Sequence, residues 1–596
     1  ANIGVGYKAG FNLSGGADNV AIGNEALSQE DATGRNIAIG TSALTIQNSG
    51  ANAYNIAIGH GAGAAVTTGV QNVLMGGLAG DAMTTGSNNT GLGYGSLSAA
   101  TTGAENTLIG ALAGDAITTG NYNTAVGYLA LSTEDEHGAN VAIGNNSLKL
   151  LNAGANGFNT AVGYDSGKAM TTGVQNTLLG GGAGDALTSG NSNTAIGYAA
   201  LSTEDETGGN TAIGWSSLVA QNAGSNAFNT AVGYSAGLAT TTAIRNTLIG
   251  GFAGLAITSG NDNVTLGYNG LSALTTGLEN IGIGVSAGSA LTVGNYNVSV
   301  GHKALSTSVD GDLNTAIGYK ALEDFEAGSD QGNNTAVGAK SQLNATTGLG
   351  NTSLGSLSMG VGAATGSNNV AIGFRAGEDI VGATDSTLVG VQAGVSLTVG
   401  NKNTAIGAFS LSTEDGHGSN TAVGYASLNT LNAGAEGQNV AIGNNSGKLM
   451  TLGVRNTLTG YNSGAVITSG TDMVAIGHNA GVSATTAVSS VIIGSFAGDA
   501  LTIGNFNVAV GHKALSTSVD GDHNTAVGVY ALEDYEDGDG NGFNTAIGSQ
   551  SQAQATTGEF NTSLGGLSMG IGVTTGDSNV AVGYLTGGAL TSGNQN

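Results

Sequence analysis

The sequence predicts an all-β protein, an elongated parallel β-solenoid or β-roll of about 34 coils with mostly 17 residues each. One five-residue phrase predicts it: Asn, then Thr or Val, a small residue, Ile or Val, and Gly. The phrase occurs 34 times, from Asn2–Gly6 to Asn579–Gly583. Its fifth residue is Gly in every copy, and its fourth is apolar in every copy except at Thr459. A period this short, sustained along the chain, indicates one coil per repeat.

Each repeat, numbered from its Asn, predicts a short strand at positions two to four and a turn at the Gly. Gly in every repeat and β-branched residues at positions two and four disfavour a helix. The absence of Pro suits a chain of laddered strands, because Pro cannot donate a hydrogen bond to a ladder. We expect the Asn residues to stack into a structural ladder and the Gly residues to form its corner. Examples are Asn123 with Gly127, Asn193 with Gly197 and Asn403 with Gly407.

Strand side chains alternate between two faces, so the second and fourth residues share one. Because the fourth is apolar almost throughout, we expect that face to be the interior and the third residue to point outward. The third residue is Leu or Ile in several repeats: Leu74, Leu108, Leu178, Leu248, Leu388, Leu458 and Ile492. Outward Leu at regular spacing requires a partner surface, which predicts a parallel homotrimer or another parallel homo-oligomer. Alternatively, these side chains cover a neighbouring turn of the same chain.

The ninth and twelfth residues vary together. Where the ninth is Gly, the twelfth is usually apolar, as in Gly184 with Leu187. Where the ninth is Leu, the twelfth is often polar, as in Leu201 with Glu204. We infer that the two positions compete for one core volume, because a void or an overfilled core costs about 1–3 kcal/mol.

The short repeats are grouped into longer repeats of 70 and 210 residues. These indicate tandem duplication within a single continuous domain, residues 1–596. Since the chain starts and stops within a repeat, we expect it to be part of a longer fibre protein.

Some steps between repeats have 19 or 20 residues. The extra residues predict protruding loops, a common place for contact with a partner; otherwise they are only looser turns. These segments are Leu148–Phe158, Leu218–Phe228, Leu428–Gln438, Leu322–Asn333 and Leu532–Phe543.

Composition excludes several classes of protein. Gly makes up 107 of 596 residues, but without a Gly-X-Y period or Pro the chain is not collagen. A net charge of −27 with 13 basic residues makes nucleic acid a poor partner. Without Cys there are no disulfides or thiolate metal sites. No apolar run approaches the roughly 18 residues of a membrane-spanning helix, so we expect no membrane insertion by this segment. No repeat departs from the pattern to assemble a nucleophile, a base and an orienting group, so we expect neither catalytic residues nor a cofactor.

The phrase Asn-(Thr/Val)-Ala-(Ile/Val)-Gly resembles the head repeats of trimeric autotransporter adhesins. That resemblance implies a left-handed parallel β-roll in a trimer. With Tyr at the sixth position and Leu at the ninth, as in Asn193–Leu201, the repeats look equally like those of bacteriophage tail fibres. Coils longer than the usual adhesin head repeat set this chain apart. Both families are structural.

Aromatic residues at the sixth position are candidates for surface contact, because an outward row of rings can stack on the sugars of a surface glycan or another receptor. They include Tyr128, Tyr198, Trp215 and Tyr268. Alternatively, the rings cover the Gly corner or pack between chains.

Paired carboxylates are weak candidates for Ca²⁺, which takes six to eight oxygen ligands; the alternative is solvated turns. They are Asp310, Asp312, Asp520, Asp522, Asp537 and Asp539. Other acidic clusters are Glu134–Glu136, Glu204–Glu206 and Glu414–Asp415. Regular Thr columns are typical of ice-binding faces, and Thr pairs recur in the turns, as at Thr84-Thr85 and Thr118-Thr119. Adjacent Thr residues on a strand point in opposite directions, however, and acidic coils interrupt the column.

Together these observations favour a non-enzymatic, extracellular, fibrous structural or adhesive protein, located at a cell surface or on a virion appendage. It would be an adhesin head or stalk, or a surface filament. The shaft of a bacteriophage tail fibre is an alternative. An ice- or calcium-dependent binding protein is an alternative of another class.

Overall fold

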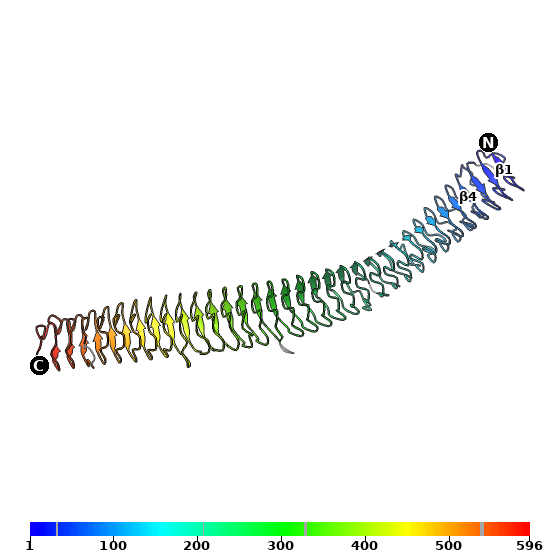
Figure 1. The fold of residues 1–596 in the computed structure, drawn as a ribbon. Helices are drawn as coiled ribbons and strands as arrows, with labels where there is room; N and C mark the ends of the chain where they lie inside the picture. Colours follow the sequence, from blue (N-terminus) through cyan, green and yellow to red (C-terminus); the bar gives the residue numbers. More distant parts are fainter. Residues whose placement is uncertain (31–33, 207, 327–330, 537–540) are drawn as a thin grey trace. The chain divides into compact units, whose positions relative to one another are not determined.

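The computed structural model describes residues 1–30, 34–206, 208–326, 331–536 and 541–596. Contacts between Cα atoms divide the chain into two compact units, Ala1–Tyr296 and Asn297–Asn596. The described residues form 34 strands of three residues each and no helix, as expected for an all-β solenoid. Each strand covers positions two to four of one repeat, and within each unit the coils stack on one another (Figure 1).

The first unit contains β1(Ile3–Val5), β2(Val20–Ile22), β3(Ile37–Ile39), β4(Ile56–Ile58), β5(Val73–Met75), β6(Thr90–Leu92), β7(Thr107–Ile109), β8(Thr124–Val126), β9(Val141–Ile143), β10(Thr160–Val162), β11(Thr177–Leu179), β12(Thr194–Ile196), β13(Thr211–Ile213), β14(Thr230–Val232), β15(Thr247–Ile249), β16(Val264–Leu266) and β17(Ile281–Ile283). The second contains β18(Val298–Val300), β19(Thr315–Ile317), β20(Thr335–Val337), β21(Thr352–Leu354), β22(Val370–Ile372), β23(Thr387–Val389), β24(Thr404–Ile406), β25(Thr421–Val423), β26(Val440–Ile442), β27(Thr457–Thr459), β28(Val474–Ile476), β29(Val491–Ile493), β30(Val508–Val510), β31(Thr525–Val527), β32(Thr545–Ile547), β33(Thr562–Leu564) and β34(Val580–Val582).

Neighbouring strands pair in parallel, with equivalent repeat positions opposite each other. Between β11 and β12, for example, Thr177 lies opposite Thr194, and Leu179 lies opposite Ile196. The same register holds across the 19-residue step from β9 to β10. The additional residues of the longer steps are therefore accommodated outside the strands, and each column of side chains contains one repeat position.

The expectation that the second and fourth residues point inward is wrong. The third residue is the buried one: Leu178 and Ala195 have no exposed surface, whereas Leu179 at the fourth position is 45% exposed. Because the coil is thin, its interior accepts only one strand residue per coil. That residue is usually Ala, so the bulkier β-branched side chains at positions two and four lie outside. The third-position Leu residues are consequently core residues and cannot themselves form an interface.

The ninth residue shares its core space chiefly with the third, and the expected exclusion between ninth and twelfth residues is not general, because Leu271 and Leu274 of one coil are both fully buried. A Cβ added to Gly184 would lie 2.9 Å from Cδ2 of Leu178, the third residue of its coil, and 3.6 Å from Cδ1 of Leu187, the twelfth. In each of the seven coils with Leu or Ile at position three, the ninth residue is Gly. A coil with Ala195 at position three instead buries Leu201 at position nine. The third and ninth side chains thus occupy the same space, and a large side chain at position three goes with Gly at position nine.

The Asn and Gly columns join successive coils. The backbone N–H of Asn210 donates to Oδ1 of Asn193 over 2.9 Å, and the same bond links Asn140 to Asn123 and Asn420 to Asn403. Gly197, at the fifth position, has a φ of +135°, and a Cβ there would collide with the carbonyl oxygen of Gly214 in the next coil. Close approach of two backbones in a left-handed conformation admits only Gly. Gly127 and Gly407 have the same geometry.

Candidate functional site

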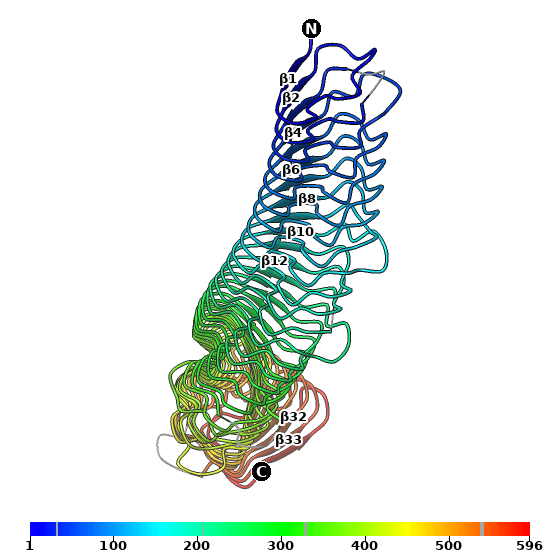
Figure 2. The same ribbon diagram turned by 90° about the vertical axis from the view of Figure 1, so that its right-hand side faces the viewer.

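The second and fourth residues of the strands form the outward side of the sheet, called here the outer face, which continues from coil to coil within each unit. Figure 2 shows strands β1–β12 following one another along one side of the first unit. Fourth-position residues such as Ile143, Leu179 and Leu266 are exposed, and the second residue is Thr, Val or Ile throughout. None of the described strands contains a charged residue, although the chain has 13 basic and 40 acidic ones. This surface is therefore partly exposed and carries no charge.

The sixth-position aromatic side chains are exposed, and neighbouring rings contact one another. Tyr198, Trp215 and Tyr234 stack in successive coils, and the Trp215 and Tyr234 rings have centroids 4.8 Å apart and planes 7° apart. The run continues edge-to-face through Phe252 to Tyr268. Tyr128 is exposed at the same position of its coil. These residues form a row of rings parallel to the coil stack.

A second aromatic row was not predicted. Phe506, His523, Phe543 and Phe560 stack with centroids 4.9, 4.6 and 5.2 Å apart. Each of them immediately precedes a ladder residue and has a left-handed backbone, which projects its side chain beside the outer face. Pairs of oppositely charged residues occupy the same position elsewhere, such as Arg245 with Asp262 and Arg455 with Asp472. The sequence could have indicated this row, because an aromatic residue precedes the Asn of each of these repeats. The five-residue phrase begins at the Asn and does not include that position.

The acidic clusters are partly buried. Glu134 and Glu414 have no exposed surface, and burial raises the pKa of both carboxyl groups. Oε2 of Glu134 accepts from the backbone N–H of Ala153 over 3.4 Å, and Glu414 bonds Ala433 in the same way. Each carboxylate thereby holds the first part of a 19-residue step in the next coil. Both glutamates therefore have a structural role. The sequence did not indicate it, because each glutamate lies in a cluster of acidic residues.

Two groups in the described part of the chain bring three possible metal ligands within 4.8 Å of one another: Glu134, Asp135 and His137, and Glu414, Asp415 and His417. The Ca²⁺ candidates are placed differently. Asp310 and Asp520 each have one buried carboxylate oxygen without a hydrogen-bond partner, and Asp312 and Asp522 form β-bridges with Gln331 and Asn541. Asp537 and Asp539 lie outside the described residues.

The 19-residue steps end in exposed tips. Residues 154–156, 224–226 and 434–436 are exposed, and a Cβ added to Gly154, Gly224 or Gly434 would meet nothing within 4 Å. The segments Leu322–Asn333 and Leu532–Phe543 lie partly outside the described residues.

The paired Thr residues of the turns bond within the stack. Oγ1 of Thr84 donates to the carbonyl oxygen of Thr101 over 3.0 Å, and Oγ1 of Thr101 donates to that of Thr118 over 3.2 Å. These hydroxyl groups link coils, so their donor protons are not directed at solvent.

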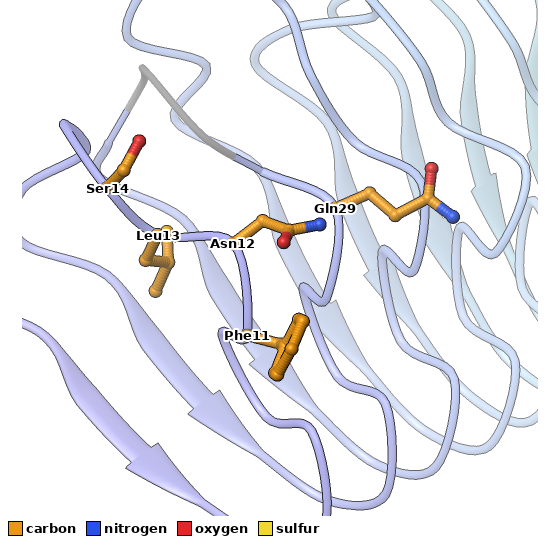
Figure 3. Close-up of a pocket in the computed structure, with 5 residues that line it drawn as sticks. All are labelled: Phe11, Asn12, Leu13, Ser14 and Gln29. Carbon is orange, nitrogen blue, oxygen red and sulfur yellow. The ribbon is translucent and has the colours of Figure 1, made fainter.

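One cavity, of about 400 Å³, lies between the first two coils. Figure 3 shows its lining, Phe11, Asn12, Leu13 and Ser14 from the first coil and Gln29 from the second. All five side chains are uncharged, so this lining offers polar and apolar contacts but no titratable group.

Comparison with known protein families and with curated proteins finds no match for this chain. Among the described residues, no helix could cross a membrane.

Proposed function

We propose that this chain is a non-enzymatic structural protein of an extracellular fibre, in which parallel copies pack side by side through their outer faces, most simply as a homotrimer. The observation that carries the proposal is the outer face, which is partly exposed in both units and contains no charge. Sheet surfaces that stay in water usually carry charged residues, which prevent association. A long uncharged face on so acidic a protein is best explained by a partner that covers it.

The exposed apolar residues of this face supply an energy comparable to the cost of assembly. Covering a fourth-position Leu or Ile that is about half exposed, such as Leu179 or Ile143, returns about 1 kcal/mol. Six of the strands β1–β17 have an exposed fourth residue, and together these return about 6 kcal/mol, against an association cost of about 4–15 kcal/mol. Parallel, in-register copies bring like columns together in every coil, so the gain grows with the number of repeats.

The repeat phrase supports the setting. Its resemblance to adhesin head repeats and to tail-fibre repeats supports a location on a cell surface, as an adhesin or filament, or alternatively on a virion. In either setting the exposed ring row that includes Tyr198 and Trp215 is the surface for a glycan or another receptor.

The outer face also favours a second candidate function, ice binding. Thr occupies the second position of six strands in succession, from Thr160 to Thr247, each opposite the next. A flat column of Thr beside apolar residues offers regularly spaced hydroxyl and methyl groups. Thermal hysteresis in dilute solution, absent from a variant with Lys at these Thr positions, would support ice binding and oppose a covered face.

Light scattering at micromolar concentration tests the assembly. We expect three times the chain mass for the natural protein. The double variant Ile143→Lys with Leu179→Lys, which places two charges on the outer face, is expected to dissociate it partly or fully. The matched control Thr172→Lys with Thr242→Lys adds the same charges at two exposed turn positions and is expected to stay assembled. A monomeric natural protein, or equal behaviour of the two variants, would refute the proposal.

A further inference from the structure

A cavity of about 310 Å³ opens in the sixth-position ring row of the first unit, across three successive coils. Tyr164 and Tyr198 lie at its two ends, and both rings are more than 60% exposed. The coil between them has Gly at both the sixth and the seventh position, Gly181 and Gly182. Asp165 and Asp185 complete the lining used here, and these six residues are called the tyrosine slot.

The slot is open because of one residue, Gly182 at the seventh position. Asp81, Asp115 and Asp499 occupy the same tenth position as Asp185, and their coils have Leu78, Leu112 and Phe496 at the seventh. In the copy 70 residues further on, Phe252 fills the corresponding space, with its ring 5.3 Å from Tyr234 and 5.7 Å from Tyr268.

At Gly182, φ is +65°, a conformation that Phe252 adopts at +58°. A Cβ added to Gly182 would meet only Asp185, at 3.8 Å. A side chain would therefore fit at this position, and the slot is a feature of the sequence and not a requirement of the fold.

The two carboxylates of the slot differ in their partners. Asp165 is neutralised by Lys168, whose Nζ lies 3.0 Å from Oδ2, and it accepts from Nδ2 of Asn146 over 2.8 Å. Oδ1 of Asp185 is buried and has no hydrogen-bond partner, and no Lys, Arg or His of the described chain forms an ion pair with this residue. Burial also raises the pKa of the Asp185 carboxyl group. The slot thus holds one uncompensated negative charge.

The ring geometry defines what fits above that charge. Sixth-position rings in adjacent coils lie 4.8 Å apart at Trp215 and Tyr234 and 6.3 Å apart at Tyr198 and Trp215, so rings two coils apart are separated by roughly 10–12 Å. A cation midway between Tyr164 and Tyr198 would lie about 5–6 Å from each ring, at a distance where a cation is still attracted to an aromatic face, which extends to roughly 6 Å. We propose that the tyrosine slot binds one alkylammonium group, held between the faces of Tyr164 and Tyr198 and paired with Asp185. The proposal does not depend on the fibre function.

Titration of the full chain with choline chloride tests the proposal, with sodium chloride at equal ionic strength as the control. Binding can be followed by calorimetry and by the fluorescence of Trp215, the single tryptophan, whose ring stacks on Tyr198. We expect saturable binding with one site per chain. Butylammonium distinguishes a lysine-like amine from a quaternary headgroup, and saturable binding of either supports the proposal. Binding of methyl glucoside without binding of either cation would overturn it.

Three variants localise the site. Gly182→Phe copies the filling that Phe252 provides, and we expect it to abolish binding while the circular dichroism melting curve stays unchanged. Asp185→Asn keeps the shape of the site and removes the charge, and we expect affinity to fall at least about tenfold.

Phe252→Gly with Leu255→Asp rebuilds the slot between Tyr234 and Tyr268 and should raise the stoichiometry to about two. Unchanged affinity in Gly182→Phe or in Asp185→Asn would overturn the proposal. Unchanged stoichiometry in a folded Phe252→Gly, Leu255→Asp variant would also overturn it.

Discussion

Leu178 and Leu179 are adjacent in β11 and face opposite sides of the sheet, so replacing each by Ala measures which side is the core. Leu178 is fully buried, and its Cδ atoms fill the space beside Gly167 and Gly184. Removing three carbon groups of Leu178 loses about 2.4 kcal/mol of transfer free energy, and the cavity raises the cost to about 3 kcal/mol. Leu179 is 45% exposed, so its truncation should cost about 1 kcal/mol and leave no cavity.

Hydrogen exchange of the amides in β10–β12 reports the local free energy of opening, which suits a repeat protein whose coils do not unfold as one unit. The difference of about 2 kcal/mol corresponds to roughly 30-fold faster exchange in Leu178→Ala than in Leu179→Ala. Burial of Leu179 against another copy would raise the cost of Leu179→Ala but could not lower that of Leu178→Ala. A cost below about 1 kcal/mol for Leu178→Ala would therefore refute the assignment of the third position to the core.

Three further predictions concern the ladder, the buried carboxylates and metal. Asn176→Ala should cost about 2 kcal/mol of local stability, because Asn176 accepts from the next coil and donates to Gly190 over 2.9 Å. Asn176→Ser should cost less in the same hydrogen-exchange measurement, since Ser386 accepts the equivalent bond with its hydroxyl oxygen; equal costs would contradict this. Burial raises the pKa of Asp115 from its usual 3.8, so the folded state binds more protons and stability falls as pH rises from about 3.8 through the folded pKa. Asp115→Asn should therefore increase the free energy of unfolding at pH 7 by less than about 1 kcal/mol, seen as a slightly higher melting temperature, and should have no effect at pH 3. A gain in stability at both pH values would contradict this explanation. Removal of divalent ions with a chelator should leave the melting temperature unchanged, because Glu134 already bonds backbone N–H groups; a rise of several degrees with Ca²⁺ would contradict that.

The repeat predicts the fold because each coil must present the same groups to the next one. The invariant fifth Gly and the Asn column mark the two places where coils meet, at Gly197 against Gly214 and at Asn193 against Asn210. The three residues between the Asn and the Gly of each repeat form the strand. This information is local and periodic, so it is accessible from one sequence.

The direction of the side chains could not be predicted in the same way. Alternation states that the second and fourth residues share a face, but not which face is inside. The apolar fourth residue suggested the wrong side, because the deciding quantity is the width of the coil. Seven Leu or Ile residues at position three, each with Gly at position nine, carried the correct signal.

Among the candidate sites, the exposed rings at Tyr128, Tyr198, Trp215 and Tyr268 were accessible from their position at the Gly corner. The burial of Glu134 and Glu414 was not, because it depends on the 19-residue step of the following coil. The tyrosine slot exists because Gly182 has no side chain. Its role could be recognised only in the structure, which shows the rings of the two neighbouring coils on either side of this residue.

The most direct test of parallel packing through the outer face is a distance between copies. The chain has no Cys, so single spin labels can be introduced at Gln71→Cys and, separately, at Ser192→Cys. Both positions are exposed beside the outer face and lie seven repeats apart in the first unit. Pulsed electron paramagnetic resonance should give one short interchain distance, the same at both sites, because parallel in-register copies place equivalent residues side by side. Distances that differ between the two sites, or no dipolar coupling at either, would contradict the proposed assembly.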